Sequence, residues 1–520
     1  MELTNLVREI DVLNKLPKKT VQVSGIQIDS RQIEAGELYV ALLGTRVDGH
    51  DFIPEAAAAG AAAVIGSRAW MDFSDLGIPY LQVNDTRKAL AAAAGAWFGY
   101  PARKMVVIGV TGTDGKTTTA NLIYQILQAA NLKAGLISTV NAVIGDRVLD
   151  TGFHVTTPEA MDVHFYLSEM IKAGISHVVL EATSHGLAQR RVAACEFDLG
   201  VVTNITHEHL DYHGDYQSYL EAKAELFKLV SSTADKPYPL NKVGVLNKDD
   251  RSYPALAEIL AGAKLSEVNY GLVGEADYQA DNITLTRDGI RFEVVTQGHK
   301  HPVFTYLLGD YNVSNCLAAA AICREGLDLE WDAIVKGIKK LQGIPGRMER
   351  IDLGQDFLAV VDFAHTPNAL NRALNSARRL VNGRVIAVFG SAGLRDKEKR
   401  RLMAEASAEL ADITVLTAED PRTESLEEIL NEMARGAAGV GGVEGKDFWR
   451  IEDRGNAIRW ALDKAEAGDV VLVCGKGHEQ SMCFDETEYP WDDRQAVRAA
   501  LAELLGLDGP SMPSLPTSSI

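Results

Sequence analysis

The residues best suited to chemistry lie in the stretch VVIGVTGTDGKTTT, residues 106–119. Glycines at 109, 112 and 115 precede Lys116 and a run of threonines that starts at Thr117. Backbone N–H groups of such a turn bind phosphate oxygens, the lysine neutralises the outer phosphates, and the threonine ligates Mg²⁺. The spacing departs from the strict P-loop pattern, because five residues separate Gly109 from Gly115. The stretch predicts a nucleotide-phosphate site, with an ordinary glycine-rich βα turn as the alternative.

Further polar residues follow the strands predicted at 177–180 and 199–204. Glu181 ends the first strand and is a suitable second ligand, since Mg²⁺ prefers oxygen donors. His209 follows the second strand and is either a ligand or a hydrogen-bonded structural histidine. Lys223 lies in a predicted amphipathic helix, where the residue pattern alone indicates a surface lysine.

These side chains need a scaffold that brings them together. Predicted strands at 105–110, 177–180, 199–204 and 243–246 alternate with helical segments, which favours a parallel α/β sheet with helices on both faces. Such sheets bind ligands at the carboxyl ends of their strands. The same rhythm returns in strands at 357–361, 385–389, 413–417 and 470–474, again with polar clusters after the strands.

We therefore expect an α/β protein with three domains. Breaks at 100–104 and 342–347 separate an N-terminal domain (1–100), a central P-loop-type ATPase domain (101–343) and a C-terminal Rossmann-like domain (344–508). In the N-terminal domain, 21–28 and 37–42 are strand candidates, and the alanine-rich runs 56–63 and 89–96 are predicted helices. The Pro/Ser-rich tail, 509–520, is predicted to be disordered.

Composition narrows the class of protein. Lys and Arg number 52 against 71 Asp and Glu, a net charge of -19, which argues against nucleic acid as the main partner. The five cysteines form no CxxC pair, as in a reduced cytosolic protein. The N-terminus lacks a signal-peptide core, and no apolar run reaches transmembrane length. We expect a cytoplasmic protein with small-molecule partners and no membrane segment.

A series of motifs carries a family resemblance: TGTDGKTTT, VTTPEA, EATSHGLAQRRV, TNITHEHLDYHGDYQSYLEAKAELF, GDYNVSN, GRMERI, VDFAHTPNAL, RDKEKRRLM and GKGHE, in this order. Together they resemble the Mur ligases, and among them the MurE type, the UDP-N-acetylmuramoyl-tripeptide synthetases. The resemblance runs from the IDSR stretch to about Leu505. It implies an ATP- and Mg²⁺-dependent ligase of peptidoglycan precursor synthesis, expected to be a monomer. Such enzymes join a diamino acid to the D-Glu γ-carboxylate of UDP-N-acetylmuramoyl-L-Ala-D-Glu through an acyl phosphate.

The resemblance also implies roles for individual residues. Lys223 matches a lysine that becomes a carbamate, and the catalytic set is Lys116, Lys223 and His209. The expected Mg²⁺ ligands are Thr117, Glu181, His209 and Lys223. ATP would be bound by Gly112, Thr113, Gly115, Lys116, Thr117, Thr118, Asn312, Asn315, Arg347, Asp362, His365 and Lys397. The UDP substrate would contact Ser30, Thr156, Thr157, Ser184, Gln189 and Arg191, and the amino acid Arg400, Glu419, Asp420, Arg422, Gly475 and Glu479.

The amino-acid pocket departs from the family pattern. Members specific for meso-diaminopimelate typically carry Asp-Asn-Pro-Arg, whereas this chain has Glu419-Asp420-Pro421-Arg422. A guanidinium fits the distal carboxylate of diaminopimelate, which favours that substrate over L-lysine or L-ornithine. Pairing of Asp420 with Arg422 would weaken this interpretation, whereas an Asp420 that faces the distal ammonium would preserve it.

Two other functions compete with this ligase. A folylpolyglutamate-synthetase-like ligase is disfavoured by the IDSR and GKGHE motifs. A nucleotide-binding scaffold that has lost catalysis is disfavoured by the intact set of Lys116, Thr117, Glu181, His209 and Lys223.

Overall fold

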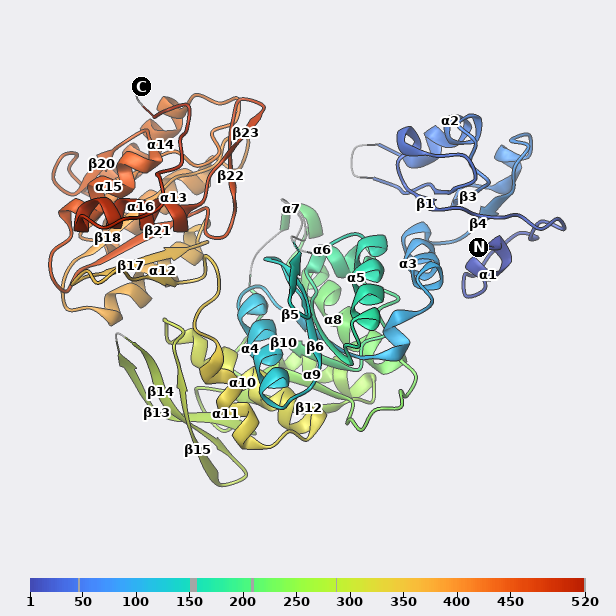
Figure 1. Cartoon of the computed structure of the whole chain (residues 1–520), viewed down its shortest axis with the longest axis horizontal. Coiled ribbons are helices and arrows are strands. Elements are labelled where there is room, and N and C mark those ends of the chain that lie inside the picture. The colour runs from blue at the N-terminus through green and yellow to red at the C-terminus, as the bar shows by residue number, and fades with distance from the viewer. Residues whose placement is uncertain (45–46, 150–156, 207–209, 287, 519–520) are drawn as a thin grey trace. The chain divides into compact units, whose positions relative to one another are not determined.

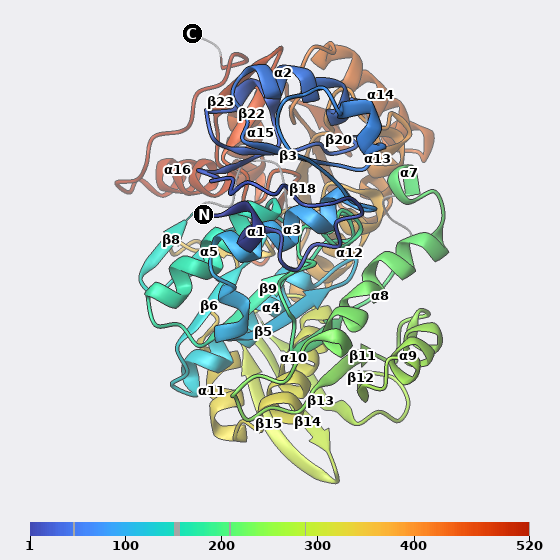
Figure 2. The same ribbon diagram turned by 90° about the vertical axis from the view of Figure 1, so that its right-hand side faces the viewer.

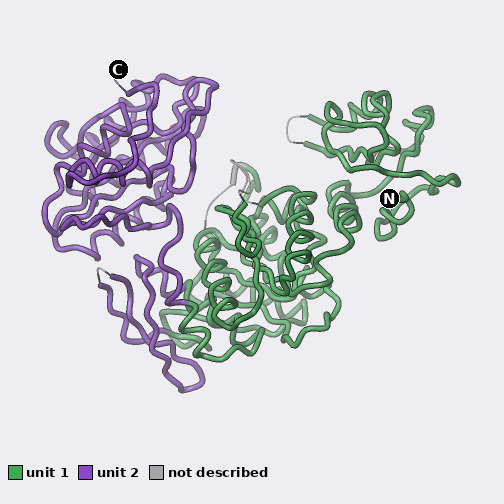
Figure 3. The backbone as a smooth tube through the Cα atoms, viewed as in Figure 1, with its two compact units in different colours: residues 1–279, 315–337 green, residues 280–314, 338–520 purple. Residues whose placement is uncertain are grey.

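The computed structural model describes residues 1–44, 47–149, 157–206, 210–286 and 288–518. The chain folds into two units, one of residues 1–279 and 315–337 and the other of residues 280–314 and 338–520 (Figure 3). No helix within the described ranges is long and apolar enough to cross a lipid bilayer. Two of the expected site residues, Thr156 and His209, lie outside the described residues.

The N-terminal part of the first unit is a parallel sheet of order β1-β2-β3-β4. Its alanine run at 89–96 is helical as predicted and packs its small side chains into the core. The prediction of one helix over 56–63 is wrong, because Gly60 turns the chain at φ +103° and Ala63 begins a buried strand. The strand expected at 21–28 is only two residues long. The elements are α1 (Leu3–Leu6), β1 (Ile26–Gln27), β2 (Leu38–Val40), α2 (Ile53–Ala58), β3 (Ala63–Gly66), β4 (Tyr80–Gln82) and α3 (Thr86–Trp97).

The second sheet of this unit contains the glycine-rich stretch. Its order is β12-β11-β10-β5-β9-β6-β7-β8, and the strands from β12 to β6 run parallel, as the alternating pattern predicts (Figure 1 and Figure 2). The strands are β5 (Val106–Thr111), β6 (Ala134–Ile137), β7 (Ala142–Ile144), β8 (Arg147–Leu149), β9 (His177–Glu181), β10 (Leu199–Val202), β11 (Val243–Asn247) and β12 (Ser266–Gly271). The helices are α4 (Lys116–Ala129), α5 (Ala160–Lys172), α6 (Ser184–Ala188), α7 (Leu210–His213), α8 (Tyr216–Ser232) and α9 (Tyr253–Gly262).

The chain passes between the units several times. Strand β13 (Tyr278–Thr286) begins in the first unit beside β12 and continues into the second, which holds the antiparallel hairpin β14 (Gly289–Thr296) and β15 (His299–Thr305). Helices α10 (Tyr311–Ala321) and α11 (Trp331–Lys340) follow, with a π-helical turn at Ile322–Gly326 between them. The unit boundaries therefore fall inside the predicted central domain, at 279–280, 314–315 and 337–338.

The main sheet of the second unit has the order β16-β17-β21-β18-β19-β20, with only β16 antiparallel. Residues of one strand alternate between two cores, so Leu358 and Val360 pack toward α12, α13 and α14, whereas Ala359 and Val361 pack toward α15 and α16. The strands are β16 (Glu349–Ile351), β17 (Leu358–Asp362), β18 (Val385–Phe389), β19 (Ile413–Leu416), β20 (Phe448–Arg450), β21 (Val470–Cys474), β22 (Ser481–Phe484) and β23 (Thr487–Pro490). The helices are α12 (Pro367–Leu380), α13 (Glu398–Leu410), α14 (Leu426–Gly439), α15 (Arg454–Lys464) and α16 (Asp493–Leu505).

The C-terminal tail differs from the prediction of disorder. Leu515 is 4% exposed and belongs to the core between the sheet and helices α15 and α16, with Met512 packed against it. The hydroxyls of Thr517 and Ser518 donate to Asp453 Oδ2 at 3.1 and 2.8 Å. Composition predicts disorder because it averages over the segment and does not register the burial of one leucine or the pairing of two hydroxyls.

A buried histidine predicts an acid-sensitive fold. His164 of α5 is fully buried, neither ring nitrogen has a hydrogen-bond partner among the described residues, and burial lowers its pKa to about 4. Below a pH of about 6.5 the unfolded chain binds a proton at this histidine that the folded chain does not bind. The contribution of His164 to the free energy of unfolding is therefore unreduced above that pH and declines toward pH 4. We expect the neutral, buried His164 to lower the free energy of unfolding by about 2.5 kcal/mol at a pH near 4.5, relative to neutral pH. Urea unfolding of His164→Leu should lack this decline, and an unchanged pH dependence would contradict the assignment.

Candidate active site

The glycine-rich stretch forms a tight turn between β5 and α4. Gly112 has φ +149°, and a Cβ there would lie 1.9 Å from Thr203 Oγ1, so the position admits only glycine. Gly115 caps α4 at φ +78°, and a Cβ there would lie 2.3 Å from Asn315 Oδ1. Asn204 holds the turn from the end of β10, because its carbonyl oxygen and Oδ1 accept the N–H groups of residues 113 and 114 at 2.7 and 3.0 Å. The turn is a rigid cradle that ends at a helix N-terminus, where unpaired N–H groups favour an anion.

Lys116 begins the helix and reaches back over this turn. Its Nζ donates to the carbonyl oxygen of Thr113 at 2.7 Å. Thr113 Oγ1 accepts the N–H of Thr206 and lies 3.1 Å from the Tyr219 hydroxyl, and Thr118 is buried on the first turn of α4. The ammonium of Lys116 and the positive end of the helix dipole thus stand together at one site.

Oxygen ligands for a hard cation lie next to the cradle. Thr117 Oγ1 is 3.1 and 3.0 Å from the two carboxylate oxygens of Glu181, which is 1% exposed at the end of β9. The N–H and hydroxyl of Thr139 also donate to Glu181, at 3.0 and 2.8 Å. A hydroxyl and a carboxylate beside a phosphate cradle fit Mg²⁺, which keeps phosphate oxygens and waters as its other ligands. Among the described residues no cluster of three His, Cys, Asp or Glu forms a metal site, and the expected ligand His209 lies outside them.

Lys223 is buried against the cradle. It is 1% exposed on α8, its Nζ donates to the carbonyl oxygen of Gly112 at 2.5 Å, and it lies 4.6 Å from the centre of the Tyr219 ring. The interpretation from the helix pattern, a surface lysine, is therefore wrong. The role that the resemblance implies for Lys223, a carbamate that helps to hold Mg²⁺, stays a prediction.

Three of the residues expected to bind the UDP substrate, Thr157, Ser184 and Arg191, lie near the carboxyl end of β9. Thr157 is 1% exposed, and its Oγ1 lies 2.9 Å from Thr183 Oγ1 and accepts the Thr183 N–H at 3.0 Å. Arg191 donates to the carbonyl oxygen of Thr157 at 2.7 Å and pairs with Glu159 at 2.7 Å. The buried Ser184 follows directly at the start of α6.

The other expected UDP contacts lie apart. Gln189 Nε2 donates to the Tyr212 hydroxyl at 3.1 Å. Ser30 is buried in a short helical turn beside the N-terminal sheet, where Asp29 accepts the Arg31 N–H. No hydrogen bond among the described residues joins Ser30 to this group, and Thr156 is not described.

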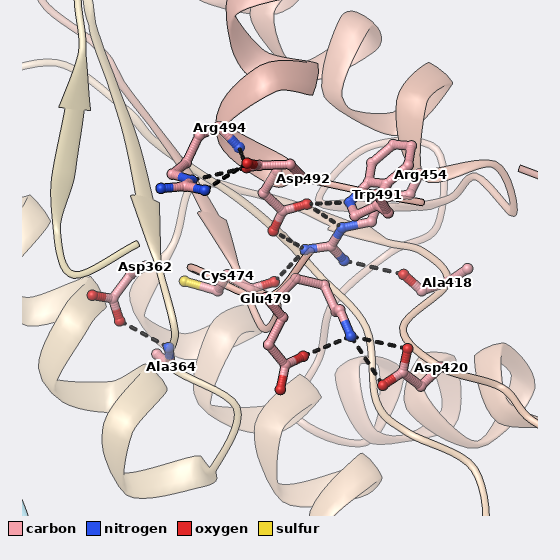
Figure 4. Close-up of polar contacts among 12 residues, drawn as sticks. Asp362, Ala364, Ala418, Asp420, Arg454, Cys474, Glu479, Trp491, Asp492 and Arg494 are labelled. Carbon is pink, nitrogen blue, oxygen red and sulfur yellow. Dashed lines mark hydrogen bonds and ion pairs between the residues drawn. The ribbon is translucent and has the colours of Figure 1, made fainter. Parts of the chain in front are cut away.

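The second unit carries a further group expected to bind ATP. Asp362 ends β17, and its two oxygens accept the N–H groups of Met348 and Ala364 at 2.7 and 2.8 Å, the latter drawn in Figure 4. Burial raises the pKa of Asp362. The Arg347 guanidinium lies 4.5 Å from the centre of the Phe363 ring, and its Nε is buried without a hydrogen-bond partner among the described residues. An unsatisfied guanidinium N–H beside a carboxylate suits a ribose or phosphate contact.

The remaining expected ATP residues differ in exposure. Asn312 is buried and donates to the carbonyl oxygen four residues earlier at 2.6 Å. His365 Nδ1 lies 2.9 Å from the Phe363 carbonyl oxygen, and the Lys397 side chain is 67% exposed. Asn315 belongs to the first unit, 3.4 Å from Thr119 Oγ1.

The expected amino-acid pocket consists of two loops, after β19 and after β21. Lys476 is 2% exposed and joins them through Asp420, because its Nζ is 3.0 Å from both oxygens of that residue. Its Nζ also lies 2.6 Å from Glu479 of its own loop, and Figure 4 labels both carboxylates. Asp420 Oδ1 also accepts the Cys483 N–H at 2.9 Å. Asp420 pairs with Lys476 and not with Arg422, so the pairing that would weaken the diaminopimelate interpretation is not seen, and contact of Asp420 with a substrate ammonium stays a prediction. Sequence reasoning missed Lys476, although it lies inside the GKGHE motif.

Glu419 of the first loop packs against Gly475 of the second. Glu419 is 6% exposed, burial raises its pKa, and its Oε2 has no hydrogen-bond partner among the described residues. A Cβ at Gly475, where φ is +113°, would lie 2.4 Å from that oxygen. Glycine therefore leaves room for a carboxylate that can accept an ammonium N–H.

Arg400 does not line the pocket. Its side chain is 1% exposed, and its guanidinium pairs with Glu424 and Glu432 at 2.8 and 2.9 Å. Nη1 and Nη2 are thus paired with carboxylates of the protein, whereas Nε is buried without a hydrogen-bond partner among the described residues, and this pairing disfavours the expected contact with substrate. Arg395, in the loop that precedes α13, is exposed.

Comparisons with known proteins cover nearly the whole chain. Family models for a Mur ligase catalytic domain, a Mur ligase middle domain and a Mur ligase glutamate ligase domain match residues 22–97, 110–323 and 346–477. The chain is 41% identical to the UDP-N-acetylmuramyl-tripeptide synthetase of Roseiflexus sp. (strain RS-1), over 97% of this chain and 99% of that protein. It is 39% identical to the UDP-N-acetylmuramoyl-L-alanyl-D-glutamate--2,6-diaminopimelate ligase of Geobacillus kaustophilus, over 92% and 95% of the two chains. A solved structure of a ligase with this second name aligns with a TM-score of 0.67 and 31% identity, over 97% of this chain and 99% of that one.

Proposed function

The chain belongs to the Mur ligase family, and we propose that it adds a diamino acid to UDP-N-acetylmuramoyl-L-alanyl-D-glutamate at the expense of ATP. The observation that carries the proposal is the cradle of Gly112–Lys116 with Thr117, Glu181 and Lys223 packed around it. This arrangement suits transfer of a phosphoryl group. The ligase acts in peptidoglycan precursor synthesis, and we place it in the cytoplasm as a monomer.

The chemistry follows from the weakness of a carboxylate as an acyl donor. An oxygen of the D-Glu γ-carboxylate attacks the γ-phosphorus of ATP, ADP leaves, and an acyl phosphate forms. The amine of the diamino acid then attacks the acyl carbon, and phosphate leaves with the oxygen that came from the carboxylate. Both steps concentrate negative charge, so the protein acts by positioning and by charge neutralisation.

The residues of the first unit divide this work. Lys116 and the N-terminus of α4 neutralise charge on the outer phosphates. Thr117 and Glu181 would hold Mg²⁺, which supplies further neutralisation at the phosphate oxygens. Lys223, as a carbamate, would offer anionic oxygens to a second such ion, and His209 is proposed as another ligand. Thr157, Ser184 and Arg191 are proposed contacts of the UDP-linked substrate.

The second unit is proposed to choose the amino acid. Because Asp420 pairs with Lys476, the Arg422 guanidinium is proposed to be available for a substrate carboxylate. Glu419 has the carboxylate oxygen without a partner and is the first candidate for an ammonium group, whereas Glu479 would share its carboxylate with Lys476. The exposed Arg395 replaces Arg400 as a second candidate for a carboxylate. This charge balance favours meso-diaminopimelate, which carries a carboxylate at each end.

Replacing Arg422 tests the choice of substrate. Arg422→Ala should lower the ratio of kcat/KM for meso-diaminopimelate to that for L-lysine roughly tenfold to a hundredfold, because a bidentate guanidinium–carboxylate contact is lost. Steady-state ADP release with each amino acid measures the ratio, and Arg435→Ala, at an exposed arginine of α14, is the control. An unchanged ratio in Arg422→Ala would make lysine or ornithine the better assignment.

The ligase itself is tested by the dependence of ADP release on its substrates. We expect ADP only when ATP, Mg²⁺, the UDP-linked dipeptide and a diamino acid are all present, together with a nucleotide product heavier by one amino-acid residue. Release with a folate and glutamate would favour the folylpolyglutamate-type ligase. No release with any set of substrates would favour a scaffold that has lost catalysis.

A further inference from the structure

The buried guanidinium of Arg454 contacts the start of both loops of the proposed amino-acid pocket. Arg454 is the first residue of α15 and is 0% exposed. Its Nη1 donates to the carbonyl oxygen of Ala418 at 3.1 Å, and its Nη2 donates to that of Cys474 at 2.7 Å (Figure 4). Ala418 immediately precedes Glu419, and Cys474 immediately precedes Gly475. The two carbonyl groups thus lie at the points where the pocket loops begin.

The sheet joins these loops only through a third strand. Strands β19 and β21 are not neighbours, because β18 lies between them and pairs with both. The sheet therefore sets the spacing of the two strands, but no direct backbone ladder joins Ala418 to Cys474. Arg454 links the two carbonyl groups directly, beyond the ends of the ladders with β18, and its planar fork fixes the direction in which they point.

Arg454 is in turn held from its other side. Its Nε and Nη2 donate to the two oxygens of Asp493 at 2.7 Å each, and Asp493 is also 0% exposed. Trp491 Nε1 donates to Asp493 Oδ1 at 2.8 Å. The guanidinium is therefore paired and locked in one orientation, so it cannot follow the loops if they move.

We propose that Arg454, anchored by Asp493, is a positioning residue that sets the geometry of the diamino-acid pocket; this inference rests on the proposed function. It acts through the carbonyl groups of Ala418 and Cys474 and does not touch the substrate. The contact of Lys476 with Asp420 joins the same two loops a second time. Loss of Arg454 should therefore weaken binding of the diamino acid more than binding of ATP or of the UDP-linked dipeptide.

The main test is the double variant Arg454→Met, Asp493→Asn. It removes both buried charges together, and the asparagine keeps an acceptor for Trp491, so the fold is spared an unpaired charge. We expect KM for the diamino acid to rise about tenfold, with KM for ATP and for the UDP-linked dipeptide within about twofold of wild type. If this variant fails to fold, Arg454→Lys keeps the charge for Asp493 but cannot reach both carbonyl groups, and it should show the same selective rise.

Two control variants separate positioning from loss of stability. Asp493→Asn keeps the two donations to the carbonyl groups and one acceptor for Arg454, so it should lower the melting temperature while KM for the diamino acid rises less than in the double variant. Arg384→Met removes another Arg–Asp pair of the same sheet, where Arg384 and Asp469 join at the amino ends of β18 and β21. An equal rise in KM in Arg384→Met would show general loosening and overturn the proposal.

Hydrogen exchange gives a readout that does not depend on activity. Amides of 419, 420, 422 and 475–479 should exchange faster in the double variant than in wild type or Arg384→Met. Unchanged exchange in both loops would overturn the proposal. A wild-type protein without ligase activity would overturn the proposed function instead, while exchange would still decide whether Arg454 holds the loops.

Discussion

Lys116→Ala is expected to lower kcat for ADP release about 1000-fold, because the variant loses the ammonium that neutralises the outer phosphates. The same substitution removes the donation from Nζ to the Thr113 carbonyl oxygen, which braces the cradle. Both losses act on the first chemical step, formation of the acyl phosphate. Affinity for the UDP-linked dipeptide should change little, because its proposed contacts lie after β9 and in the short helical turn beside the N-terminal sheet. Pre-steady-state ADP release and calorimetric titration measure the two effects separately.

The matched control for this substitution is Lys133→Ala, at an exposed lysine just beyond the same helix. It removes an equal charge from the same unit without touching the cradle, and it should behave as wild type. Equal losses of phosphoryl transfer and of dipeptide affinity in Lys116→Ala would contradict the division of work proposed here.

Lys223→Ala should be nearly as damaging, with a loss in kcat of about 100-fold to 1000-fold. The proposed carbamate supplies anionic oxygens beside the phosphates, and an alanine supplies none. The side chain is buried, with its Nζ on the Gly112 carbonyl oxygen, so the substitution acts directly on the cradle. Formate or acetate added to the variant should restore part of the activity, because a small carboxylate can take the place of the carbamate.

Lys228→Ala is the control, since Lys228 lies on the same helix with an exposed side chain paired to Glu225. It should keep full activity. Wild-type activity in Lys223→Ala would contradict the proposed catalytic role of Lys223. With ¹³C bicarbonate, the NMR spectrum of the wild-type protein should show a carbamate resonance that is missing in Lys223→Ala. Absence of this resonance from the wild-type spectrum would contradict the carbamate.

The phosphate cradle could be predicted because its signal is local. The strand, the glycines and Lys116 follow one another in the sequence. The backbone at Gly112 and Gly115 has positive φ angles, which glycine adopts readily, so the glycines themselves indicate the turn. The strands that carry Glu181 and Asp362 were predicted in the same way, from short apolar runs.

Burial and pairing of charged residues could not be read from such patterns. Lys223 lies in a helix whose sequence is that of a half-exposed helix, and only its packing against the cradle buries it. Asp420 and Lys476 are 56 residues apart, so the choice between Lys476 and the nearby Arg422 depends on how two loops meet. Arg454 and Asp493 likewise come from different helices, and neither lies in a recognised motif.

The most direct test of the account follows the oxygen of the substrate carboxylate. The UDP-linked dipeptide is labelled with ¹⁸O in the γ-carboxylate of D-Glu, and the phosphate released in one turnover is analysed by mass spectrometry. If an acyl phosphate forms, the bridging oxygen leaves with the phosphate, so each released phosphate should carry one oxygen from the labelled carboxylate. Ligated product accompanied by phosphate without ¹⁸O would contradict the proposed mechanism.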